Sequence, residues 1–152
     1  DADALNICGK HRELLALIPE NSILTPHPKE FERLTEKAKN DFHQLELLRS
    51  FCQKYKVYVT LKGSHTAIGT PDGSVYFYST GNPGMATGGT GDVLTGVLTA
   101  LISQKYDSLS ASLLGVYLHG LAGNLAAEKL SQESLIASDV ISHLSDAFKS
   151  LY

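Results

Sequence analysis

The spacing of apolar positions predicts an alternation of helices and strands along the chain. Ala4–Ile18 carries a loose apolar face and predicts a helix that is interrupted or weakened at Gly9. The short apolar run Ser22–Thr25 predicts a buried strand, and Pro28 suits the first turn of the helix that follows. The remaining predicted elements are a helix capped by Asp41 that runs to about Tyr55, a strand Lys56–Lys62, and a hairpin of Thr66–Gly69 and Val75–Tyr78. They are followed by helices Thr90–Ser103 and Leu109–Leu130 and by a last helix that opens at Ser138 as N-cap and runs to about Lys149.

This order of elements is typical of an α/β protein in which helices cover a layered sheet of buried strands. The length of 152 residues fits a single domain, 1–152, by the usual size of domains. Hydrophobic residues make up 43% of the chain and charged residues 19%, which is typical of a globular protein and excludes a disordered one.

Charge and cysteine content narrow the class of partner and the compartment. The net charge is −3 and no basic run is present, so we expect neither nucleic acid nor a membrane surface as a partner. The two cysteines, Cys8 and Cys52, form no C-x-x-C pair, which suits a reduced cytoplasmic protein and argues against a zinc site. We also expect no apolar run of the roughly 20 residues that a membrane-spanning helix needs.

The start of the chain predicts a fragment. It opens on "DADALN" without a methionine, in a stretch that is typical of the exit from a strand, yet no apolar strand precedes it. We therefore expect an upstream part of the domain to be missing, which would leave one edge of the sheet unpaired.

Glycine is concentrated in "GNPGMATGGTGDVL", Gly81–Leu94, where five of fourteen residues are glycine. The run ends on a predicted helix start, where backbone N–H groups lack intrahelical partners and favour an anion such as phosphate. It is not a P-loop, because Asp92 stands where that motif has lysine. It is not a dinucleotide fingerprint either, because Leu94 occupies the position of the third glycine.

Asp92 allows two interpretations of equal weight. A carboxylate beside a bound phosphate is unfavourable unless it has a chemical role, such as taking the proton from a hydroxyl that attacks phosphorus. Alternatively, Thr90 caps the helix and Asp92 only complements the helix dipole in the first turn.

Two further polar segments follow predicted strands, where open α/β sheets bind their ligands. Lys62–Thr66 offers a cation and a small polar turn for a nucleotide, although an ordinary turn with a solvated lysine explains it more simply. His27 is held between two prolines and is either a rigid ligand contact or, more simply, a surface histidine. Asp1 and Asn6 are further candidates to face a site at the sheet edge, although N-capping explains them more simply.

His119 lies in the apolar segment "VYLHGLAG", and we expect it to be packed or hydrogen-bonded within the protein. The glycines of this segment and Gly115 allow a neighbouring element to approach closely. Elsewhere, no three His, Cys, Asp or Glu residues have the spacing of a metal cage, so the sequence predicts no protein metal site.

Several segments together resemble the ADP/ATP-dependent NAD(P)H-hydrate dehydratases of the ribokinase-like superfamily. The resemblance covers nearly the whole chain, and its most specific parts are "NPGMATGGTGD" and "GVYLHGLAG". The other segments that carry it, in order, are "DADALN", "LTPHPKEFERL", "LKGSHTAI", "LAAEKL" and "SLIASDVI".

The resemblance implies a repair reaction, in which the hydroxyl of hydrated NADH or NADPH is phosphorylated and phosphate is then eliminated. Asp92 matches the acid that deprotonates the hydroxyl and contacts the substrate, and His27 matches a second substrate contact. The matching nucleotide-binding residues are Lys62, Gly63, Ser64, His65, Thr66, Gly88, Gly89, Thr90 and Gly91. "MATGGTGD" is similar to the bacterial form, which implies ADP rather than ATP as donor, with Mg²⁺ accompanying the phosphates.

Two alternatives stay open at this point. One is a small-molecule kinase of the same superfamily, acting on a vitamin precursor or a sugar, which would use the same loop and acid but release a stable phosphoester. The other is an inactive nucleotide-binding fragment, because members of the resembled family carry a substantial additional half. We also expect self-association into a homo-oligomer.

Overall fold

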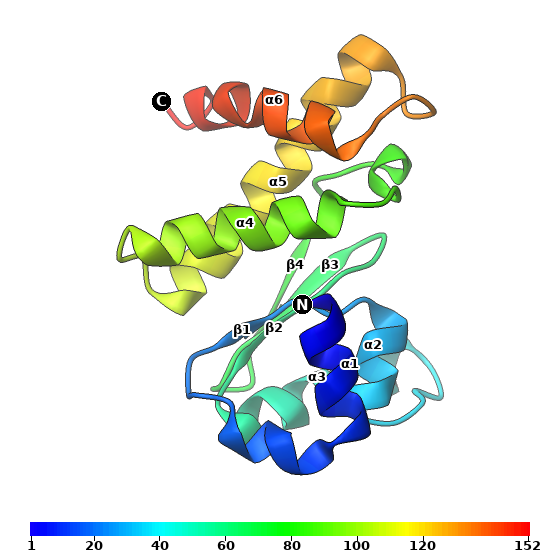
Figure 1. Ribbon diagram of the computed structural model, residues 1–152, viewed down its shortest axis with the longest axis vertical. Coiled ribbons are helices and arrows are strands. Elements are labelled where there is room, and N and C mark those ends of the chain that lie inside the picture. Colours follow the sequence, from blue (N-terminus) through cyan, green and yellow to red (C-terminus); the bar gives the residue numbers. More distant parts are fainter. The chain divides into compact units, whose positions relative to one another are not determined.

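A computed structural model describes residues 1–152, and the chain separates into two compact units, Asp1–Phe77 and Tyr78–Tyr152 (Figure 1). Each unit has its own buried apolar cluster.

Unit 1 contains three α-helices, a 3₁₀ helix and a sheet. In chain order these are α1 (Ala2–Lys10), η1 (Arg12–Leu17), β1 (Ile23–Leu24), α2 (Pro28–Leu34), α3 (Asp41–Tyr55), β2 (Tyr58–Leu61), β3 (Thr66–Gly69) and β4 (Val75–Tyr78), whose last residue begins unit 2.

The sheet of unit 1 is mixed, with the strand order β1-β2-β3-β4. β1 runs parallel to β2, with Ile23 opposite Tyr58 and Leu24 opposite Val59, whereas β2 and β3 are antiparallel. β2 and β3 are apolar and largely buried, because α3 packs against both. Phe31, Leu48 and Val59 belong to the resulting core.

Unit 2 is helical beyond the end of β4. The short 3₁₀ helix η2 (Pro83–Met85) is followed by α4 (Thr90–Ser103), α5 (Ser108–Leu130) and α6 (Ala137–Lys149). α5 packs against both α4 and α6 (Figure 1). The core of this unit includes Leu118, Ala122 and Val140, which are fully buried.

α5 is more apolar than the sequence analysis expected. With 23 residues it is long and apolar enough to cross a membrane by length and composition alone, contrary to the expectation that no such run exists. Half of its most apolar window is buried inside the protein. Packing against α4 and α6 therefore accounts for the hydropathy of α5, which is no indication of a membrane protein.

The predicted elements are confirmed, and the differences lie at their ends. The long N-terminal helix does break, but at His11, beyond the expected Gly9. α3 is capped by Asn40, whose Oδ1 accepts the His43 N–H at 2.9 Å, and not by Asp41. Ser138 lies inside α6, not before it. The break at His11, the N-cap of α3 at Asn40 and the N-cap of α6 at Ile136 differ from the predicted positions by one or two residues, which apolar spacing alone does not determine.

Candidate functional site

Unit 1 gathers its candidate residues at one edge of its sheet. β1 and β2 are parallel, so their carboxyl ends meet at the same edge. The Lys62 N–H donates to the Pro26 carbonyl at 2.9 Å, which joins the two segments that follow these strands. The structure thus brings His27 and Lys62–Thr66 together, as expected for a ligand-binding edge.

His27 is the N-cap of α2, a role that the sequence analysis missed. Its Nδ1 accepts the N–H groups of Lys29 and Glu30 at 3.2 and 3.3 Å, so its proton is on Nε2. Glu30 accepts the His27 N–H at 2.8 Å and is 6% exposed. The two residues form a capping box, for which the H-x-x-E spacing after a strand was the available signal.

The Nδ1 edge of the His27 imidazole is therefore held by the helix cap, and the Nε2 edge is accessible to a ligand. Its side chain is 46% exposed, and Nε2 lies 3.6 Å from the Glu30 carboxylate, beyond hydrogen-bond distance. The N–H at Nε2 can donate to an oxygen of a ligand without disturbing the cap.

Lys62 forms an ion pair with Asp1, with 3.1 Å between Nζ and Oδ1. Both side chains are partly buried. Asp1 makes no side-chain cap on α1, so the simpler explanation of Asp1 as a helix cap is wrong. Asn6 does not cap either, since its Oδ1 accepts from Arg33 at 2.5 Å. The neighbouring turn residues Gly63–His65 are exposed and accessible to a ligand.

The glycine loop of unit 2, residues 80–89 between β4 and α4, ends at an uncapped helix. Gly89, not Thr90, is the N-cap of α4, and no side chain bonds to the first N–H groups of the helix. Gly89 has φ of +91°, a left-handed conformation directly before the right-handed Thr90. Adjacent residues of opposite hand direct their N–H groups to one side and form an anion-binding concavity. A Cβ at Gly88 would meet nothing within 4 Å, so the loop is open there.

The buried side chain of Thr90 stabilises the loop by hydrogen bonds to its backbone. Its side chain is 7% exposed, and its hydroxyl lies 2.7 Å from the Met85 carbonyl and 2.9 Å from the Thr87 carbonyl. The expectation that His119 is a hydrogen-bonded helix residue is confirmed, because its Nε2 lies 2.9 Å from the Thr90 carbonyl oxygen.

Asp92 is the third residue of α4 and is exposed. Its carboxylate makes no hydrogen bond and no ion pair in the structure. It complements the helix dipole, as one interpretation held, but it does not cap the helix. An exposed, unpartnered carboxylate beside unbonded N–H groups is able to accept a proton from a bound hydroxyl.

No three His, Cys, Asp or Glu residues are grouped so as to hold a metal ion. Mg²⁺ commonly binds through substrate phosphates and one or two carboxylates and keeps several waters. The chain therefore fits a Mg²⁺ ion that arrives on a nucleotide, and it offers no all-protein cage.

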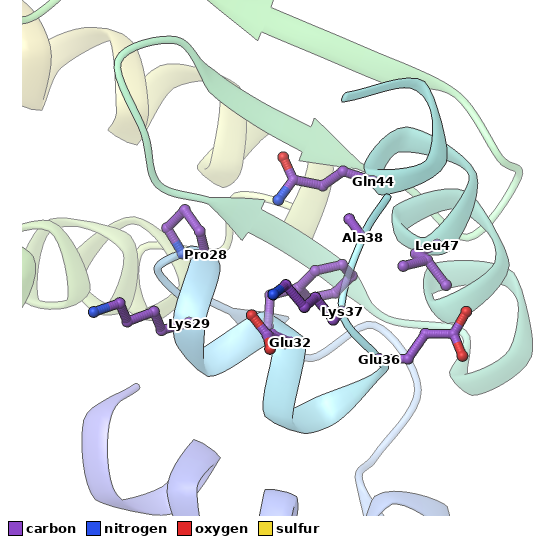
Figure 2. Close-up of a pocket in the computed structure, with 9 residues that line it drawn as sticks. Pro28, Lys29, Glu32, Glu36, Lys37, Ala38, Gln44 and Leu47 are labelled. Atoms are coloured by element: carbon purple, nitrogen blue, oxygen red, sulfur yellow. The ribbon is translucent and has the colours of Figure 1, made fainter. Parts of the chain in front are cut away.

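A pocket of about 170 Å³ lies between α2 and α3 (Figure 2). It includes two lysines and two glutamates over an apolar floor, and its lining residues are Pro28, Lys29, Phe31, Glu32, Glu36, Lys37, Ala38, Gln44 and Leu47. The charges balance, and neither His27 nor Lys62–Thr66 lines it. It lacks the excess of positive charge that a nucleotide would require.

The fold is ribokinase-like: a ribokinase-like superfamily protein from Enterococcus faecalis superposes with a TM-score of 0.75 at 25% identity over 96% of the chain. A hydroxyethylthiazole kinase from Pyrococcus horikoshii shares this fold, with a TM-score of 0.75 at 15% identity over 97% of the chain. The chain belongs to the NAD(P)H-hydrate dehydratase family, whose model matches residues 1–145.

Individual relatives agree with the family. The chain is 41% identical to the bifunctional NAD(P)H-hydrate repair enzyme Nnr of Moorella thermoacetica over 99% of its own length. It is 39% identical to the ADP-dependent (S)-NAD(P)H-hydrate dehydratase of Neisseria meningitidis over 84% of its length. The Bacillus subtilis ADP/ATP-dependent NAD(P)H-hydrate dehydratase, crystallised with ATP and Mg²⁺, superposes with a TM-score of 0.81 at 34% identity over 89% of the chain.

The chain is shorter than these relatives. It spans 29% of the Moorella protein, 45% of the Neisseria protein and 50% of the Bacillus structure.

Proposed function

We propose that this chain is the phosphoryl-transfer part of an ADP-dependent NAD(P)H-hydrate dehydratase. The observation that carries the proposal is the amino end of α4, where unbonded N–H groups and an open glycine loop stand beside the exposed, unpartnered Asp92. An anion site next to a general base is what phosphorylation of an alcohol needs.

In the proposed reaction, Asp92 accepts the proton of the hydroxyl on the hydrated nicotinamide ring. The hydroxyl oxygen then forms a bond to the terminal phosphorus of ADP, and the bond from that phosphorus to the bridging oxygen breaks, releasing AMP. The N–H groups of Gly89–Gly91 stabilise the negative charge on the transferred group. Loss of phosphate, together with a ring proton, restores the double bond and yields NADH or NADPH.

The residues of unit 1 have the matching binding roles. We propose that Lys62–Thr66 bind the nucleotide, with the exposed turn Gly63–His65 as the contact surface. His27 donates from Nε2 to the hydrated dinucleotide, which the fixed tautomer supports. Because Lys62 is paired with Asp1, its charge reaches a phosphate only if that ion pair is exchanged or shared. Mg²⁺ bound to the nucleotide supplies counter-charge to the phosphates.

ADP is proposed over ATP because of the sequence resemblance, and a cytoplasmic location because of the cysteine content. A homo-oligomer is proposed because a second chain would cover the unpaired edge of the sheet. These three points stay predictions, as does the single domain 1–152.

The test uses the intact product of the encoding gene with ADP and hydrated NADH. We expect recovery of the absorbance of reduced nicotinamide and release of one phosphate per turnover. Asp92→Asn should lower turnover by ~10²–10⁴-fold, because the general base is lost. ADP binding, measured by calorimetry, should persist, since the variant removes a negative charge next to the phosphate site. Normal turnover in Asp92→Asn would show that the base is misassigned.

The kinase alternative shares this loop and base, because kinases share the fold. Mass spectrometry of the products separates the two reactions. A lasting phosphoester without recovery of NADH identifies a kinase, and free phosphate with NADH identifies the dehydratase.

A further inference from the structure

The glycine loop packs against the segment His119–Asn124 of α5. Gly120 and Gly123 have no side chains, and their places are filled from the loop: a Cβ at Gly120 would lie 2.5 Å from the Thr80 hydroxyl oxygen, and a Cβ at Gly123 would lie 2.2 Å from the Met85 sulfur. A Cβ at Gly120 would also lie 2.7 Å from the Thr80 backbone carbon, so glycine is required there by the approach of the loop. A larger residue at Gly123 would require the Met85 side chain to move.

Asn82 fastens the same loop to α5 by hydrogen bonds. Its Nδ2 donates to the Gly123 carbonyl at 2.9 Å and lies 3.1 Å from Oδ1 of Asn124. Its own Oδ1 accepts the Gly84 N–H at 3.0 Å, which sets the turn of η2. One side of the loop is thus anchored on this stretch of α5 before α4 begins.

His119 makes the contact nearest to the anion-binding end. A carbonyl oxygen only accepts, so the His119 Nε2 that lies 2.9 Å from the Thr90 oxygen must carry a proton and donate. The Thr90 carbonyl and the Gly91 N–H belong to one planar trans peptide and point in opposite directions. Fixing the carbonyl on the α5 side therefore fixes the N–H on the other side.

We propose that His119 is a positioning residue that orients and polarises the Thr90–Gly91 peptide. The hydrogen bond from His119 withdraws charge through the peptide and makes the Gly91 N–H a stronger donor, because linked hydrogen bonds reinforce one another. The inference rests on the proposed function, in which this N–H faces the transferred phosphoryl group. It assigns His119 an effect on the transition state, where charge on that group grows.

The test compares His119→Phe, which keeps a ring but loses the donor, with His119→Gln, whose amide nitrogen replaces Nε2. In the intact gene product, His119→Phe should lower kcat by about tenfold, less than the ~10²–10³-fold cost of deleting a donor outright. The KM for ADP should change by less than about threefold, because the ground state carries less charge. His119→Gln should recover most of kcat. His143→Phe is the matched control, since the His143 Nδ1 only contacts the Asp139 carbonyl in its own helix, at 2.8 Å.

A second readout does not depend on turnover. With ¹³C in threonine carbonyls and ¹⁵N in glycine, NMR observes the Thr–Gly peptides, which in this chain are Thr80–Gly81, Thr87–Gly88, Thr90–Gly91 and Thr95–Gly96. The signal that disappears in Gly91→Ala is that of Thr90–Gly91. Addition of ADP should shift the Gly91 amide proton downfield in the wild type and in His119→Gln, and by less in His119→Phe. This measurement tests the role of His119 even if the wild type has no dehydratase activity. Absence of activity would reject the proposed function but would not reject the role of His119.

Two results overturn the inference. One is a His119→Phe variant with wild-type kcat and an unchanged Gly91 response to ADP. The other is an equal loss in His119→Phe and His119→Gln together with a lowered melting temperature, because that pattern marks a residue needed only for packing.

Discussion

At the scale of the residue, Gly89 has a backbone conformation that is unfavourable for residues with a side chain. A side chain at φ of +91° costs about 1–2 kcal/mol. Gly89→Ala also places its Cβ 3.1 Å from that of Ala137, so we expect a loss of about 1–2 kcal/mol in urea unfolding and weaker ADP binding.

Gly96→Ala is the control for that variant. Gly96 lies in the middle of α4, and a Cβ there meets nothing within 4 Å. It should raise the free energy of unfolding by about 0.5–1 kcal/mol, because alanine loses less conformational entropy in a helix than glycine does. An equal loss in both variants would show that the strain is not specific to Gly89.

Cys52 makes the free energy of unfolding decrease at alkaline pH. Burial raises the pKa of its thiol to about 12, whereas the thiol of an unfolded chain has a pKa of about 8.5. The neutral thiol is favoured in the folded state, so its contribution to stability is complete below about pH 8.5 and is lost as pH rises toward 12. We expect a decline of about 1.4 kcal/mol per pH unit across this window from Cys52.

Urea unfolding between pH 8 and 10 measures this decline. Cys52→Ala should be less stable than the wild type at pH 8, because a buried atom is lost, but its stability should fall less steeply with pH. Parallel curves for the two proteins would contradict the assignment.

At the scale of the element, capping decides where the helices begin. Asn40→Ala removes the side chain that accepts the His43 N–H, and we expect a cost of about 1 kcal/mol in the free energy of unfolding. Asn40→Asp keeps an acceptor and should stay within a few tenths of a kcal/mol of the wild type. The helical signal in circular dichroism during urea unfolding reports both. Equal stability of Asn40→Ala would mean that Asp41 is able to replace the cap.

The sequence predicts the elements well because their apolar spacing is strong. β3, β4 and α4 have the expected ends, since a Pro-Asp-Gly turn and a glycine run mark them. The meeting of His27 and Lys62–Thr66 at one edge of the sheet was also predictable, because it follows from parallel strands. The His27–Glu30 cap and the Lys62–Asp1 ion pair were not, because side-chain partners far apart or at adjacent turns depend on packing that spacing does not describe.

At the scale of the whole molecule, the chain spans about half of the solved Bacillus relative. His27 and Lys62–Thr66 belong to the first unit, and the glycine loop with Asp92 belongs to the second. We therefore expect the 152-residue chain to bind ADP in calorimetry but to turn over hydrated NADH far more slowly than the intact gene product. Equal kcat/KM for the two would show that this chain is sufficient.

Gly120 and Gly123 of α5 also constrain which substitutions the family accepts. A Cβ at Gly120 would lie 2.7 Å from the Thr80 backbone carbon, so no change of the side chain at position 80 makes room for a larger residue at position 120. The nearest atoms to a Cβ at Gly123 belong to the Met85 side chain, so an increase in size at position 123 is offset by a smaller or displaced side chain at position 85. Position 120 should accordingly stay glycine among homologues, whereas positions 85 and 123 should covary.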